Sequence, residues 1–115
     1  MRYLLLIYQE PSVLPRNEAE FATMATEYGA YGRWLADTGQ LLGGEALKSV
    51  SDATTVAVRD GRRVITDGPY AETKEILGGY YLIDSPDLDA AIEAAARIPG
   101  AKTGRVEIRP IMEMP

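Results

Sequence analysis

Apolar residues recur along this chain in stretches that alternate between strand-like and helix-like spacing. A continuous apolar run at residues 3–8 predicts a central strand, because unbroken runs are typical of strands covered on both faces. From about Asn17 to Thr38, apolar residues recur at steps of three and four, which predicts an amphipathic helix ended by Gly39. The expected apolar stripe of this helix comprises Phe21, Met24, Ala25, Tyr28, Gly32 and Leu35, with Tyr31 at its edge and Trp34 off it.

The middle of the chain has the alternation and turn residues of β-structure. Residues 40–47 predict a second strand, in which Gly43-Gly44 favours a bulge or a close backbone contact. Residues 54–58 and 63–66 flank Asp60-Gly61, a dipeptide typical of tight hairpin turns. The sequence therefore predicts a β-hairpin after the second strand. A further strand is predicted at residues 79–83.

The last third of the chain predicts a second helix and a final strand. Ser85 is the expected helix cap, with Pro86 at the first helical position, and Pro99-Gly100 ends the helix. Its expected apolar face comprises Leu88, Ala91, Ile92 and Ala95. Val106 and Ile108 then alternate with charged residues, as in a half-exposed strand.

This order of elements predicts one α+β domain over residues 1–115. Strand, helix, strand, hairpin, strand, helix and strand make a ferredoxin-like βαββαβ pattern with an inserted β-hairpin. Its antiparallel sheet carries two helices on one face, so the opposite face needs another cover. For so short a chain we expect a second copy packed sheet to sheet about a twofold axis, which makes a homodimer.

Composition narrows the possible partners and chemistry. The net charge of −5 repels phosphate backbones and anionic lipid surfaces, so neither nucleic acid nor a membrane is an expected partner. The chain has no cysteine and no histidine, which excludes disulfides, Ser-His-Asp triads and most zinc or iron sites. No metal and no cofactor is expected. The first apolar run is too short for a signal peptide or a membrane span, so a cytoplasmic location is expected.

Polar and reactive side chains are most concentrated between the hairpin and the strand at residues 79–83. There the sequence reads Asp67-Gly68-Pro69-Tyr70-Ala71-Glu72-Thr73-Lys74-Glu75, with Gly78-Gly79 two residues later. Asp-Gly-Pro is typical of a tight turn in which the aspartate bonds to nearby backbone amides. A carboxylate held by such a turn is also preorganised for acid-base work or for binding a polar group.

This segment resembles the signature of the DGPF group within the YCII-related family, with Tyr70 where the named motif has phenylalanine. The first strand, the Gly61-Arg62 region and the C-terminal Val-Glu-Ile-Arg-Pro extend the resemblance over nearly the whole chain. It implies a dimeric α/β barrel and no established activity. Many DGPF members are encoded beside extracytoplasmic-function sigma factors. A histidine and an aspartate are suggested as a catalytic pair in the wider family, and only the aspartate, Asp67, has a counterpart here.

These considerations give one candidate catalytic residue, Asp67, and a set of candidate ligand-binding residues. In the functional interpretation, the segment at residues 67–75 is a lid over a cavity between sheet and helices, and Lys74 recognises an anionic group. In the structural interpretation, the same segment is a solvated loop with weak surface ion pairs. The candidate ligand-binding residues are Tyr8, Tyr70, Glu72, Thr73, Lys74, Gly78 and Gly79. Rings such as Tyr8 also fill a core or a dimer interface in most proteins.

Three functions remain open from the sequence. The first is a domain that binds a small polar or anionic metabolite, and the family resemblance implies an accessory role in sigma-factor regulation. The second is a cofactor-independent enzyme of the isomerase, lyase or monooxygenase type, with Asp67 as general acid or base. The third is a purely structural role, which predicts that side chains fill the region around Asp67.

Overall fold

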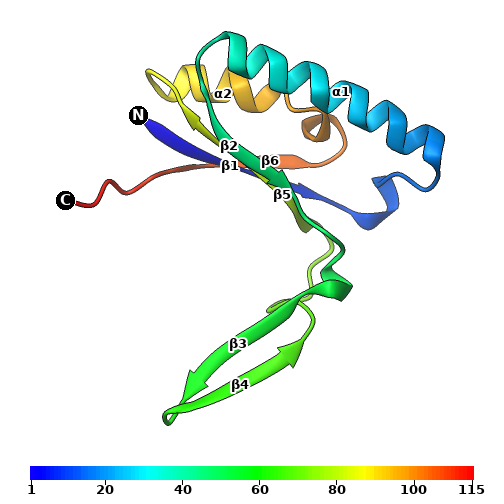
Figure 1. Ribbon diagram of the computed structural model, residues 1–115, viewed down its shortest axis with the longest axis vertical. Helices are drawn as coiled ribbons and strands as arrows, with labels where there is room; N and C mark the ends of the chain where they lie inside the picture. The colour runs from blue at the N-terminus through cyan, green and yellow to red at the C-terminus, as the bar shows by residue number, and fades with distance from the viewer.

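A four-stranded antiparallel sheet carries both helices of the protein. The computed structural model describes all 115 residues and shows the sheet order β2-β5-β1-β6 (Figure 1). The strands are β1 (Arg2–Gln9), β2 (Leu41–Ala46), β5 (Ile76–Asp84) and β6 (Arg105–Pro110), and the helices are α1 (Glu18–Asp37) and α2 (Leu88–Ala96). The predicted α+β, ferredoxin-like arrangement with an inserted hairpin is confirmed. A dimeric barrel is a property of two chains and stays a prediction.

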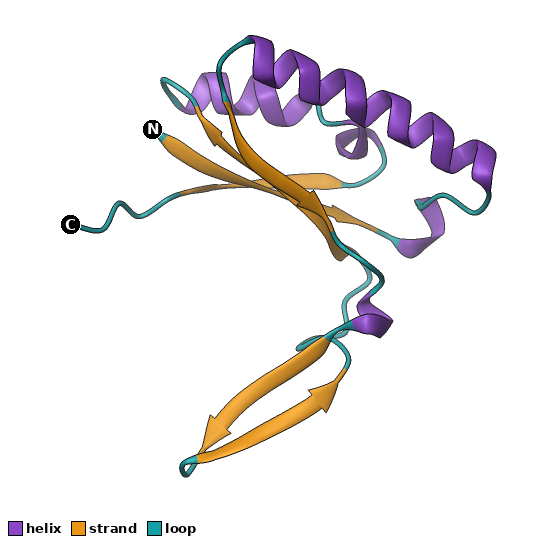
Figure 2. Cartoon of the chain, in the orientation of Figure 1, coloured by secondary structure: helices purple, strands orange, loops and turns teal.

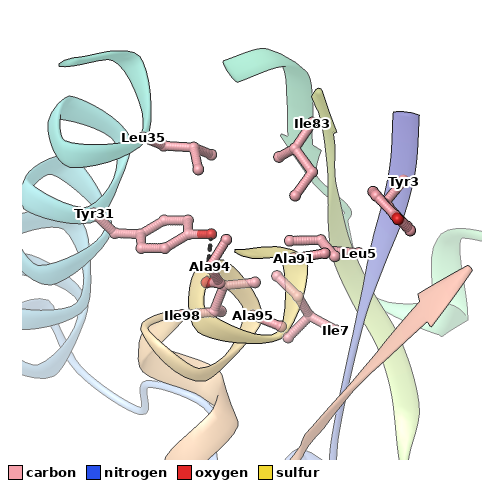
Figure 3. Packing of buried hydrophobic residues seen from close by; sticks show 10 residues of the cluster. All are labelled: Tyr3, Leu5, Ile7, Tyr31, Leu35, Ile83, Ala91, Ala94, Ala95 and Ile98. Carbon is pink, nitrogen blue, oxygen red and sulfur yellow. Dashed lines mark hydrogen bonds between the residues drawn. The ribbon is translucent and has the colours of Figure 1, made fainter. Parts of the chain in front are cut away.

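Both helices cover the same face of the sheet, and the core lies between them and the strands (Figure 2). Tyr3, Leu5 and Ile7 of β1 point into this layer, as the alternating burial along the strand shows. The remaining buried apolar residues are Ile83 of β5, Tyr31 and Leu35 of α1, Ala91, Ala94 and Ala95 of α2, and Ile98 (Figure 3). Three alanines let α2 lie close to the strands, because their side chains are short.

The opposite face of the sheet is apolar at its centre and carries no helix. Leu4 and Leu6 of β1 alternate with the core residues and are half-buried. Their cross-strand partners on β5 are Leu82 and Tyr80, which lie on the same face. On β6 the partners are Arg109 and Glu107, so charged groups flank this apolar strip. We call Leu4, Leu6, Tyr80 and Leu82 the open sheet face.

Helix α1 is rotated relative to the predicted stripe. Tyr31 is inside the core, where its hydroxyl donates to the carbonyl of Ala94 at 2.8 Å, and Phe21 is exposed. Trp34 packs beside Tyr31, and the guanidinium of Arg97 lies 4.3 Å from the centre of its ring. Only the second half of α1 contributes buried residues, so a stripe drawn over the whole helix could not fix its rotation.

The start of α2 also differs from the prediction. Asp87, not Ser85, caps the helix, since its carboxylate accepts from the backbone N–H of Ala90 at 2.8 Å. Ser85 is buried and donates instead to the side-chain oxygen of Gln40, which joins the end of β5 to the start of β2. Leu88 and Ile92, expected in the core, are about half exposed.

Strands β3 (Thr54–Arg59) and β4 (Arg62–Asp67) form a separate two-stranded sheet, which we call the arm. Asp60 and Gly61 at its tip have φ angles of 52° and 74°, as the predicted two-residue turn requires. Figure 1 shows the arm projecting from the sheet on the side away from the helices. The radius of gyration is 16.0 Å, against roughly 13 Å for a compact domain of this length.

Candidate functional site

A groove of about 620 Å³ opens between the N-terminal half of α1 and the end of the sheet formed by β2 and β5. Twelve of its 21 lining residues are hydrophobic. Those that carry the argument are Met24, Ala25 and Tyr28 of α1, Gly44 and Glu45 of β2, Lys48 beyond β2, and Gly78, Gly79 and Tyr81 of β5. The groove lies between helix and sheet, where the sequence predicts a cavity, but Asp67 and Lys74, expected beside that cavity, do not line it.

Glycines in the floor of the groove allow β2 and β5 to lie close together. A Cβ at Gly44 would lie 2.7 Å from the carbonyl oxygen of Tyr80 and 2.8 Å from the ring of Tyr81. A Cβ at Gly79 would lie 3.0 Å from the carbonyl oxygen of Glu45. The predicted irregularity of β2 is confirmed by a register shift between Leu41 and Gly43. Both strands thus lack a side chain where they form the floor of the groove.

Two tyrosine hydroxyls supply neutral polar groups to a mostly apolar lining. Tyr28 accepts a hydrogen bond from the backbone N–H of Gly100 at 3.2 Å, which leaves its own proton available. The hydroxyl of Tyr81 makes no hydrogen bond within the protein, and it is not sealed from solvent. Burial raises the pKa of both phenols, so both groups stay neutral at physiological pH. A neutral hydroxyl can donate to, or accept from, a ligand's polar group.

Charged side chains of the groove lie at its outer strand. Glu45 and Lys48 are both exposed and belong to β2 and the residues that follow it. A second hollow of about 590 Å³ lies on the other side of α1, toward Gly100 and Lys102, and shares Met24 and Tyr28 with the groove. The N-terminal half of α1 therefore has open space along both flanks.

The residues predicted from the sequence divide between the groove and other places. Gly78 and Gly79 line the groove. Tyr8 lies on β1 with its side chain on the face away from the helices. Asp67, Tyr70, Glu72, Thr73 and Lys74 are all exposed, at the end of β4 and in the loop that follows, and none of them lines the groove. Tyr70 is 92% exposed.

The loop after β4 is held by backbone and surface contacts. Gly68 has a φ of 104°, and its N–H donates to the carbonyl of Ala53 at 2.7 Å, so the turn interpretation of Asp67-Gly68-Pro69 holds for the backbone. The Asp67 carboxylate, expected to bond to nearby amides, makes no hydrogen bond. Lys74 lies 3.4 Å from Glu10, and Arg105 lies 3.0 Å from Glu75. Exposed pairs of this kind stabilise a protein little.

Sequence reasoning missed three groups that the structure brings to the groove: Tyr28, Lys48 and Tyr81. The sequence pattern assigns Tyr28 to an apolar stripe, and its hydroxyl is the available signal that this stripe also carries a polar group. Tyr81 is one of several alternating rings in the sequence, with nothing to distinguish it from the others. No three acidic side chains lie close enough together to hold a metal ion.

The buried tyrosines predict a loss of stability at alkaline pH. Burial raises the pKa of Tyr28, Tyr31 and Tyr81 above the ordinary value of 10.0. Above that pH the unfolded chain binds fewer protons than the folded chain, so the free energy of unfolding falls as pH rises. Urea unfolding between about pH 9 and about pH 11 should show this fall. Tyr81→Phe should make it shallower; an unchanged slope would mean that Tyr81 is not desolvated.

The fold and the groove define a class: a ferredoxin-like α+β domain with a hollow between helix and sheet and an open sheet face. A family model for the YCII-related domain matches residues 1–115, and the chain belongs to that family. An uncharacterized protein of Rhizobium meliloti (strain 1021) is 34% identical over 114 residues, which cover 96% of this chain and 92% of that protein. Neither comparison names a reaction or a ligand.

Neither helix combines the length and apolar character that a membrane-spanning segment requires.

Proposed function

We propose that this YCII-related protein binds a small molecule in the groove between α1 and the sheet. The observation that carries the proposal is the groove itself, which at about 620 Å³ falls within the range of natural ligand sites. Its lining is mostly apolar, so the ligand is a largely apolar or aromatic molecule with one polar or anionic group. This is less polar than the metabolite expected from the sequence.

The polar groups of the groove suggest how such a ligand lies. Tyr28 and Tyr81 both line the groove, from α1 and from β5. They can hold a carbonyl or hydroxyl group of the ligand. Lys48, exposed beside the groove, can pair with an anionic group that remains in water. In this arrangement Lys48 has the role that the sequence suggested for Lys74.

The proposed working unit is a homodimer in which two open sheet faces pack together. Leu4, Leu6 and Leu82 would otherwise remain in contact with water. The isolated chain exposes 8280 Å² of surface, against roughly 6,200 Å² for a compact monomer of its mass. That excess is larger than the roughly 800 Å² each partner contributes to a standard interface.

Binding of an aromatic anion tests the ligand site. Anilinonaphthalene sulfonate fluoresces more strongly in apolar sites, and we expect saturable binding of one probe molecule per chain. Ala25→Trp places a large side chain in the groove and should weaken binding about tenfold or more. Ala22→Trp is the matched control, because Ala22 is an exposed residue of the same helix that does not line the groove. Equal binding by both variants would place the probe elsewhere and remove the support.

The enzyme function and the sigma-factor accessory role both stay predictions. The Asp67 carboxylate is exposed and outside the groove, so acid-base catalysis by Asp67 on a groove-bound ligand has no geometric support within one chain. Asp67→Asn is accordingly expected to leave probe binding unchanged. The accessory role beside a sigma factor depends on family resemblance alone.

A further inference from the structure

The arm has an apolar face that no part of its own chain covers. Val56 pairs with Ile65 and Val58 pairs with Arg63, so the side chains of Val56, Val58 and Ile65 share one face of the ribbon. They are 59%, 61% and 62% exposed. A two-stranded ribbon is marginally stable by itself in water, and this one pairs with no other strand. The arm therefore needs a surface to pack against.

We propose that the arm clasps a second copy of this chain, with the face formed by Val56, Val58 and Ile65 buried on it. The inference rests on the proposed sheet-to-sheet dimer and adds to it a second, separate contact. The occupant of the arm's apolar face is the partner chain, not a ligand and not a different protein.

The direction and the length of the arm fit this role. The arm leaves the sheet on the side opposite the helices, which is the side of the open sheet face (Figure 2). Stacked sheets lie about 10 Å apart, whereas six-residue strands such as β3 and β4 extend roughly 20 Å. An arm of this length passes beyond the partner's sheet and ends at the level of the partner's helices.

Charge at the end of the arm is complementary to the helix layer it would reach. Arg59, Arg62 and Arg63 surround the turn, against the single carboxylate of Asp60. The two helices with their caps are acidic, with Glu18, Glu20, Glu27, Asp37, Asp87, Asp89 and Glu93 against Arg33 and Arg97. The chain as a whole carries −5, so two copies repel each other unless basic groups are placed between them. Basic arm tips supply such groups at the periphery of the dimer.

Thiol reactivity tests the clasp directly, because the natural chain has no cysteine. Val56→Cys puts a single thiol on the apolar face, and Val64→Cys puts one on the other face of the same ribbon. In one isolated chain the two positions are similarly accessible, at 59% and 47% exposed. In the dimer we expect an aromatic disulfide reagent to modify the thiol at position 56 at least about tenfold more slowly than the thiol at position 64. Dilution to monomer should bring the two rates together.

Sedimentation of the same samples separates the two proposals. A chain that is monomeric at all concentrations defeats the dimer and the clasp together. A dimer in which both thiols react at equal rates defeats the clasp and leaves the sheet-to-sheet dimer standing. Protection of position 56 that persists in the monomer would mean that the arm folds back on its own chain, which also overturns the clasp.

Arg62→Glu should weaken the dimer several-fold at low salt, and this effect should shrink at high salt.

Discussion

Leu6→Lys on the open sheet face is expected to convert the proposed dimer into a monomer. Leu6 lies in the central strand β1 between Tyr80 and Glu107, at the middle of the apolar strip. In a dimer, two ammonium groups related by the twofold axis would be buried close together, which costs several kcal/mol. The dimer dissociation constant should therefore rise about 100-fold or more. Sedimentation at several concentrations measures it.

Within one chain, Leu6→Lys should lower the stability of the fold only slightly, so that a loss of dimer can be assigned to the interface. A lysine at position 6 can reach water in the monomer and lies across from the carboxylate of Glu107. Leu88→Lys is the matched control, because Leu88 is about half exposed on α2, outside the open sheet face, so that a lysine there can affect at most the contact with the partner's basic arm tip. If both lysine variants dimerise as the natural chain does, the open sheet face is not the interface.

Leu5→Ala, one residue away, is expected to lower the free energy of unfolding by about 2–5 kcal/mol. Leu5 has no exposed surface, and its neighbours across the sheet are Tyr81 and Ile108. Truncation leaves a cavity at the centre of the ten-residue core, which those strand neighbours cannot fill without distortion. Urea unfolding measures the loss. Leu88→Ala removes the same atoms from an exposed position and should change stability by less than about 0.5 kcal/mol.

A stability loss at position 5 close to that of the control would contradict the burial of β1 beneath the helices. Together the two neighbouring leucines test the two faces of one strand. Leu5 should affect folding and Leu6 association, because successive residues of a strand point to opposite sides.

The fold was predictable where a local pattern determines structure. The run at residues 3–8, the Asp60-Gly61 turn and the Gly39 helix end each specify an element through backbone geometry or periodicity, and all are found. The rotation of α1 was not predictable in the same way. Its stripe contains apolar residues along the whole helix, but only the second half of the helix is packed. The buried hydroxyl of Tyr31 donates a hydrogen bond to the carbonyl of Ala94, a partner that is distant in the sequence.

The candidate site was only partly predictable, for a related reason. Gly78 and Gly79 are part of the motif and do line the groove. The polar residues of the motif lie at the end of β4 and in the loop that follows, and no local pattern shows that none of them lines the groove. Tyr28 and Tyr81 come together only because α1 packs across the sheet. Such a pair has no signature in either segment alone.

The contact between Arg97 and Trp34 determines what fluorescence can report for this protein. Trp34 is the only tryptophan in the chain, and it sits where α1 meets the end of α2. Its emission follows the separation of the two helices. The arm, residues 54–67, contains no aromatic residue at all. Unfolding curves recorded by tryptophan emission therefore do not register detachment of the arm, which has to be observed with a label placed on the arm itself.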